Sequence, residues 1–224
     1  IIIYFISLFL FNLNLAAEEF NIVAKEILID KENEILVGKG AVRAVDSEGQ
    51  LINADKITYE KSREFLLAEG NVKITDIEGN ILKTDKTTYD KINEIITTYE
   101  NTELILKEGY NLVTKNISYN IKSKILTTKE NSVLSDNEGN IVETDMFQYN
   151  IKNSLFSSVG KIKIIDVKKN KYFFKELHVD TKKKEMIGSD VSVVLDQKNF
   201  GVSEESDPRL VANDILVTKN KTNL

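Results

Sequence analysis

The chain has 224 residues, of which 42% are hydrophobic and 29% charged, with a formal net charge of −5. A chain of this composition can bury a core, and its acidic balance disfavours a general nucleic-acid binder, which needs a basic face. It contains no cysteine, which excludes a disulfide framework, a zinc–thiolate site and thiol catalysis within these residues.

The first segment, residues 1–17, is an apolar run that ends in the small residues Ala16 and Ala17. This order is typical of a secretory signal peptide, and the run is too short for a confident transmembrane helix. We therefore expect cleavage near Ala17 and an exported domain over residues 18–224. An uncleaved membrane anchor is the alternative.

From residue 21 to residue 200 the sequence holds a register of 30 residues. The repeated positions include a column of tyrosines, a column of glycines and a column of aspartates. Their members are Tyr59, Tyr89, Tyr119 and Tyr149; Gly49, Gly79, Gly109 and Gly139; and Asp55, Asp85 and Asp145. Self-similarity at a fixed period predicts an elongated fold in which each repeat stacks on its neighbours.

Each repeat predicts strands and hairpin turns rather than helices. Segments such as INADKITYE (52–60) and NVKITD (71–76) alternate and are rich in β-branched and aromatic residues, which favour a pleated surface. The sequences DIEGN (76–80) and DNEGN (136–140) are typical of tight turns. We expect roughly 14 to 20 strands, joined locally and antiparallel.

The apolar positions change phase inside one strand of each repeat. Ile52 and Ala54 are even-numbered, whereas Ile57 and Tyr59, after the aspartate, are odd-numbered. Side chains alternate strictly along a strand, so the change requires a bulge or bend at which the strand turns a corner. We therefore predict an all-β, elongated, twisted β-jelly roll, with a β-solenoid as the related architecture.

The repeated motifs resemble the OstA-like lipopolysaccharide-transport family over residues 22–217. The best examples are ADKITY (54–59) and AEGNVKI (68–74). The tail, residues 200–212, is most similar to the N-terminal periplasmic domain of the family's outer-membrane assembly protein, in which a β-barrel follows. A stand-alone periplasmic bridge protein of the same family is the alternative. Some members carry disulfides, which this chain cannot form.

The resemblance implies a non-enzymatic function in lipopolysaccharide transport. The two sheets of the family's jelly roll shield the acyl chains in an apolar groove, and the lipid passes across the periplasm to the outer membrane. The implied partners are lipopolysaccharide, a periplasmic bridge protein bound by edge-strand pairing, and an outer-membrane barrel with its lipoprotein plug. No cofactor, metal or nucleic acid is implied.

Burying acyl chains needs a long apolar lining, because each buried CH₂ contributes about 0.8 kcal/mol. The repeated apolar columns are the candidate lining, although they could equally fill a closed core. The candidate lipid-binding residues are Ile57, Leu66, Ile74, Ile96, Leu104, Ile117, Leu126, Leu134, Phe147, Phe156 and Ile164. The tyrosine column is either a ladder at the edge of the groove or a structural ladder.

The first repeat is the expected docking edge for another strand, because an edge strand presents unpaired backbone groups. Its candidate residues are Ile22, Val23, Ile27 and Ile29.

Catalysis has little support in the sequence. The sole histidine, His178, has no matched partner at a catalytic spacing, and phosphate-binding glycine loops and His–Glu metal motifs are absent. The aspartate column follows the repeat, so we assign it to the strand bend. The alternative from another class is an exported structural or adhesin-type β-solenoid with a closed core. A carbohydrate-active enzyme on a β-helix scaffold is a weaker third.

Overall fold

The computed structural model describes residues 20–46, 49–107, 109–196, 208–218 and 221–223. The predicted signal peptide, residues 1–17, lies outside this part of the chain. Among the described residues the only helix is a 3-10 turn at Lys61–Arg63, so no helix there could span a membrane.

The described chain forms one antiparallel sheet of 18 strands. The predicted all-β, antiparallel fold is therefore confirmed. The strands are β1 (Asn21–Val23), β2 (Glu26–Asp30), β3 (Ile35–Val45), β4 (Leu51–Glu60), β5 (Phe65–Thr75), β6 (Ile81–Asp90), β7 (Ile95–Ile105), β8 (Asn111–Thr114), β9 (Ser118–Asn120), β10 (Ile125–Thr128), β11 (Ser132–Ser135), β12 (Ile141–Thr144), β13 (Phe147–Asn150), β14 (Leu155–Ile165), β15 (Lys171–Asp180), β16 (Glu185–Val194), β17 (Arg209–Thr218) and β18 (Lys221–Asn223).

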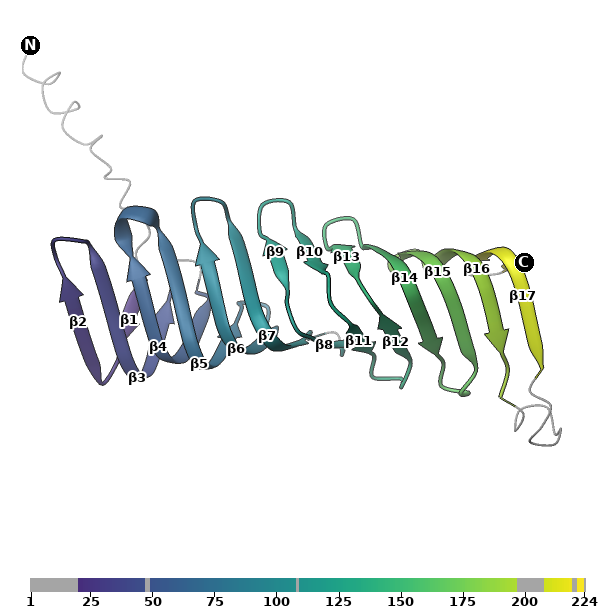
Figure 1. Cartoon of the computed structure of the whole chain (residues 1–224), viewed down its shortest axis with the longest axis horizontal. Coiled ribbons are helices and arrows are strands. Elements are labelled where there is room, and N and C mark those ends of the chain that lie inside the picture. The colour runs from purple at the N-terminus through teal and green to yellow at the C-terminus, as the bar shows by residue number, and fades with distance from the viewer. Residues whose placement is uncertain (1–19, 47–48, 108, 197–207, 219–220, 224) are drawn as a thin grey trace, which may run out of the picture.

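The sheet is a meander that advances along the long axis of the molecule (Figure 1). β3 to β7 and β14 to β17 each pair with the strand that follows. In the centre each strand is split into two halves: β7 pairs with both β8 and β9, and β14 pairs with both β12 and β13. Because tight turns join the strands of each short repeat, each full strand pairs with the one that follows it in the sequence.

Every full strand crosses a corner, so the sheet is folded over into two arms. We call the portions that end at the turns containing Gly49, Gly79, Gly109 and Gly139 the glycine arm. The portions that carry Tyr59, Tyr89, Tyr119 and Tyr149 are the tyrosine arm.

The predicted change of phase falls at this corner. In β4, Ile52 and Ala54 are buried before it and Ile57 and Tyr59 after it. The sequence-predicted bend is therefore confirmed.

In β3, β5, β7 and β14 the corner contains a β-bulge, in which two residues face one residue of a neighbouring strand. In β5, Gly70 and Asn71 have φ values of 75° and 47° and lie opposite Asp55. Asn71 donates a hydrogen bond from Nδ2 to Asp55 Oδ2 at 2.8 Å. The Lys161 N–H donates to Asp145 Oδ2 at 3.1 Å in the matching bulge of β14. At these two positions the aspartate column supports the bend, as the sequence predicted.

The turns of the glycine arm follow the predicted pattern. Asp76 Oδ1 accepts hydrogen bonds from the backbone N–H groups of Glu78 and Asn80 at 2.9 and 2.8 Å. Gly79 has φ of 94°, a conformation that glycine adopts without strain.

Apolar side chains from the two arms pack against each other in two clusters. The first lies in the N-terminal strands and contains Phe20, Val42, Ala44, Ile52, Ala54, Ile57, Tyr59, Leu66, Ala68, Val72 and Ile74. The second contains Leu112, Ile117, Leu126, Phe147, Phe156, Ile162, Phe174, Leu177, Val191, Val193 and Ile215.

Candidate functional site

An apolar groove lies between the two arms where the first cluster gives way to the second. Its volume is about 520 Å³, within the range of about 300–1,000 Å³ typical of ligand sites. The glycine arm contributes Ile74, Leu82, Leu104 and Leu106, and the tyrosine arm contributes Tyr89, Ile96, Ile117, Tyr119 and Leu126. The groove therefore has an apolar floor built by strands of both arms.

The rim of the groove is charged, because the lining reaches the turns at the ends of the arms. These turn residues are Asp46, Asp76 and Glu78 at the glycine arm, and Glu64, Lys91, Glu94 and Lys124 at the tyrosine arm. An apolar floor beneath a charged rim suits an amphipathic ligand whose polar end stays in water.

Beneath the groove, the corner is lined by side chains that carry hydroxyl groups. The equivalent corner positions in the N-terminal strands carry apolar side chains. The hydroxyls of Thr102 and Thr98 are 2.8 Å apart, and the Ile117 N–H donates to Thr98 Oγ1 at 2.9 Å. Thr84 Oγ1 is 3.2 Å from Thr102 Oγ1. Thirty residues earlier in the register these three positions are Ala54, Ala68 and Val72. We call the buried hydroxyls of the corner the hydroxyl seam: Thr84, Thr98, Thr102, Thr114, Thr128, Ser132, Thr144 and Ser158.

The candidate lipid-binding residues divide into three groups, of which the groove group overlaps the clusters: Ile74 also belongs to the first cluster, and Ile117 and Leu126 to the second. The groove is lined by Ile74, Ile96, Leu104, Ile117 and Leu126. Two candidates, Ile57 and Leu66, lie in the first cluster with an exposed fraction of 0%. The remaining four, Leu134, Phe147, Phe156 and Ile164, lie in or against the second cluster. Their contact with lipid stays a prediction.

Sequence reasoning missed several lining residues, namely Leu82, Leu106, Ile121 and Ile151. Leu82 could have been found, because it lies directly opposite Ile74 and Leu104 across the strand pairs. The tyrosine column divides: Tyr89 and Tyr119 line the groove, whereas Tyr59 is buried in the first cluster.

The predicted docking edge is made by β1 and β2. Both strands pair with β3, and among the described residues neither has a partner on its other side. Ile27 and Ile29 share the inner face of Ile57 and Tyr59 through β3, yet they are 43% and 64% exposed. Ile22 is half-buried and Val23 is exposed.

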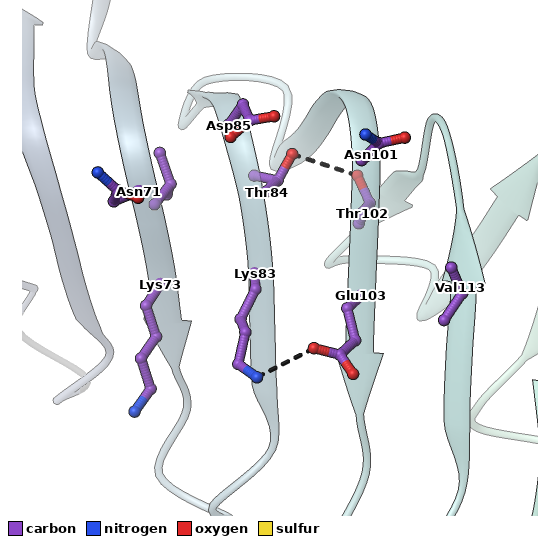
Figure 2. Close-up of a pocket in the computed structure, with 10 residues that line it drawn as sticks. Asn71, Lys73, Lys83, Thr84, Asp85, Asn101, Thr102, Glu103 and Val113 are labelled. Atoms are coloured by element: carbon purple, nitrogen blue, oxygen red, sulfur yellow. Dashed lines mark hydrogen bonds and ion pairs between the residues drawn. The ribbon is translucent and has the colours of Figure 1, made fainter.

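A second hollow, of about 370 Å³, lies on the outer face of the sheet across β5 to β8. Figure 2 shows Lys73, Lys83 and Glu103 side by side along it, with Asp85 and Asn101 nearer the corner. The Lys83 ammonium and the Glu103 carboxylate are 3.0 Å apart. Polar side chains dominate this hollow, so it provides no apolar enclosure.

The described titratable groups with shifted pKa values are not among the residues that line the groove, although Asp90 lies between Tyr89 and Lys91 of its lining. The side-chain amide of Asn93 and then its backbone N–H lower the pKa of Asp90. Burial raises the pKa of the Tyr172 hydroxyl, as does its hydrogen bond to Asp166. In the described ranges no three His, Asp or Glu side chains form a metal-binding group.

The histidine is a half-exposed surface residue, but it has two partners that the sequence did not reveal. His178 has two partners: its Nδ1 is 3.0 Å from Ser157 Oγ, and its Nε2 is 2.8 Å from Glu176 Oε1. All three side chains lie on the outer face of the tyrosine arm, because His178 pairs with Ser157 across β14 and β15 and Glu176 is two residues away on β15. The contact therefore lies outside the apolar groove.

Comparison with known proteins adds little. No protein-family model and no curated protein matches the chain. Among solved structures, the chain is similar to LptH from Pseudomonas aeruginosa, described as the LptA-homologous periplasmic component of the lipopolysaccharide transport device. The identity is 11%, the match covers 87% of this chain and 94% of that chain, and the TM-score is 0.26. A likeness this distant carries no argument about function.

Proposed function

We propose that the chain is a non-enzymatic carrier that shields the acyl chains of lipopolysaccharide in the groove between its two arms. The observation that carries the proposal is the apolar floor of the groove, about 520 Å³ in volume and lined from both arms, beneath a charged rim. The family-like motifs at residues 54–59 and 68–74 support the choice of lipid.

Binding in such a site requires no covalent change in the ligand, because burial of apolar groups supplies the free energy. Each CH₂ moved from water into the groove contributes about 0.8 kcal/mol, so a single acyl chain supplies most of the binding free energy. The half-buried side chains Leu82, Leu104 and Leu106 would become fully buried on binding. The sugar and phosphate groups of the lipid remain outside, in water.

The proposed route places the carrier in the periplasm, delivering lipid to the outer membrane. The predicted signal peptide, residues 1–17, supports export. The apolar edge at Ile27 and Ile29 supports docking of a periplasmic bridge protein by strand pairing. A following barrel with a lipoprotein plug is the partner we propose at the other end, on the resemblance of the tail.

A structural, adhesin-type solenoid is the second candidate. It is favoured by the complete burial of Ile57 and Leu66 in the first cluster, since a closed core is all that a structural role requires. The two candidates differ in whether the groove takes up an apolar chain.

The test is lipid binding by matched variants of neighbouring strands. Leu104 lines the groove on β7, and Val113 is 49% exposed on the outer face of β8. Purified, delipidated protein is titrated with fluorescently labelled lipopolysaccharide. We expect Leu104→Arg to weaken binding at least about tenfold, because it places an unpaired charge on the apolar floor. Val113→Arg should bind as the wild type does. No binding by the folded wild type would favour the structural role.

A further inference from the structure

On its N-terminal side the apolar floor of the groove meets the first cluster, where Tyr89 packs against Phe20. Phe20 contacts Tyr59 and Tyr89 edge-on, with ring centroids 5.6 and 6.1 Å apart. Tyr89 lines the groove. Phe20 therefore lies behind Tyr89 at this end of the apolar floor, and its own exposed fraction is 8%.

The Phe20 side chain contacts the tyrosine arm, but its backbone lies next to the glycine arm. The next residue, Asn21, begins β1 and pairs with Val45 in the glycine arm. The Phe20 ring therefore spans the space between the arms. It lies before β1 and outside the 30-residue register, so no strand pairing depends on its side chain.

The open part of the groove is about as long as one acyl chain. Along the tyrosine arm its apolar lining runs from Tyr89 on β6 past Ile96 on β7, Tyr119 on β9 and Leu126 on β10 to Ile151, in the turn after β13. These are four strand spacings, or about 19 Å. One leaflet of a bilayer's hydrocarbon core is about 15 Å deep, half of the full thickness.

We propose that Phe20 is a length stop, which determines how long an apolar chain the groove accepts. This inference rests on the proposed function, since it assumes that the groove holds an acyl chain. Without the Phe20 ring, Tyr89 can move into the vacated space. The groove would then extend toward Tyr59 and Leu66, which lie one or two strand spacings further along, or about 5–10 Å.

The experiment measures chain-length preference in the full chain. Delipidated protein is titrated with laurate, stearate and behenate, each displacing a fluorescent fatty acid. The wild type should bind laurate and stearate and discriminate against behenate, whose end has no apolar cover. In Phe20→Ala the affinity for behenate should rise about tenfold or more, with laurate changed little.

Phe174→Ala is the matched control. Phe174 is similarly buried, at 4% exposed, but belongs to the second cluster and does not line the groove. It should leave the length preference unchanged. If Phe20→Ala does not fold, as judged by circular dichroism, Phe20→Leu provides the same test with a smaller shift.

The outcomes separate the two proposals. If the folded wild type displaces no probe with any fatty acid, the lipid-carrier function is wrong. If the wild type binds and the Phe20 variants keep its length preference, the groove stands but Phe20 is not the stop. A shift that Phe174→Ala reproduces would also overturn the stop, since general loosening would then explain it.

Discussion

The N-terminal strands and the central strands follow the same 30-residue register. The N-terminal region is nevertheless packed, whereas the central region contains the groove. In β3 to β5 the corner is filled by Ala54, Ala68 and Val72, all buried. In β6 and β7 the same positions are Thr84, Thr98 and Thr102. At each of these three positions an apolar side chain is replaced by threonine. Hydrogen bonds therefore take the place of apolar packing at the corner.

The backbone follows this division only in part, since β6 and β7 carry the threonines and are still unbroken. β3, β4 and β5 cross the corner unbroken, whereas β8 and β9 are two halves of one crossing strand. The carbonyls freed at the breaks need partners, and the seam supplies them. For example, Thr144 Oγ1 donates to the Met146 carbonyl at 3.0 Å. Hydroxyls therefore satisfy backbone carbonyls where the central strands are interrupted.

The largest expected difference between the regions concerns truncation of a leucine. Leu66 is 0% exposed in the first cluster, so Leu66→Ala should lower the free energy of unfolding by about 2–5 kcal/mol. Leu104 is half-buried at the groove, and Leu104→Ala should cost less than about 2 kcal/mol. Urea unfolding followed by circular dichroism measures both, and equal losses would contradict the contrast between the regions.

The next largest effect on stability is expected at the bulge in β5. Gly70 has φ of 75°, and a Cβ there would lie 2.5 Å from Asp55 Oδ2. Gly70→Ala should therefore destabilise by about 2 kcal/mol or more, because backbone strain and a close contact add. Gly79→Ala, with φ of 94° but nothing within 4 Å, is the matched control and should cost about 1 kcal/mol.

The equivalent bulge position in the central region is Glu100, with φ of 64°. Glu100→Gly should stabilise by about 1 kcal/mol. Destabilisation by this substitution would show that the Glu100 side chain matters more than its backbone strain.

An effect of similar size is expected at the hydroxyl seam. Thr98→Val keeps the shape but leaves the Ile117 N–H without its acceptor, at a cost of about 1–3 kcal/mol. The reciprocal change Ala68→Thr buries a hydroxyl in an apolar corner and should cost a similar amount. If thermal unfolding shows that Ala68→Thr is neutral, the two corners are chemically interchangeable.

The smallest effect is pH dependence, which should be alike at two turns of the glycine arm, the one after β11 and the one after β14. Burial acts to raise the pKa of Asp136, but hydrogen bonds from Asn140, Glu138 and Gly139 outweigh it and lower the pKa below its usual 3.8. A lowered folded pKa gives stability that is present above the unfolded pKa and is lost as pH falls through the folded value. Stability should therefore decline below pH 3.8.

Asp166, in a turn beside the second cluster, has a lowered pKa through the same balance. Asp136→Asn and Asp166→Asn should each flatten the acid limb of a stability–pH curve to a similar degree. A large difference between them would mean that local packing, rather than the turn itself, controls the acid response.

Much of the fold was predictable because it is local. The turn at Asp76 to Asn80 and the phase change between Ala54 and Ile57 are both determined by neighbouring residues, and the structure has both. The groove was predictable only in part, since Leu66 and Ile96 occupy the same apolar column and differ only in what packs around them. Contacts of high sequence separation decide that packing.

Phe20 is the clearest example of a residue whose role could not be predicted from the repeat. It precedes the repeated register, so no column contains it, and its contacts with Tyr59 and Tyr89 depend on how the arms fold over. The threonine columns, by contrast, were visible in the sequence. Their polarity relative to Ala54 and Ala68 was the available signal for a corner held by hydrogen bonds.

Photocrosslinking tests most directly whether apolar chains enter the groove but not the packed clusters. A photoreactive residue is placed at Leu104 and Ile96 in the groove, at Phe156 in the second cluster, and at Lys73 on the outer face. After mixing with lipopolysaccharide and irradiation, we predict adducts at Leu104 and Ile96 alone. Equal adducts at Phe156 would indicate a continuous open interior, and the absence of adducts at all four sites in folded protein would contradict lipid uptake by the groove.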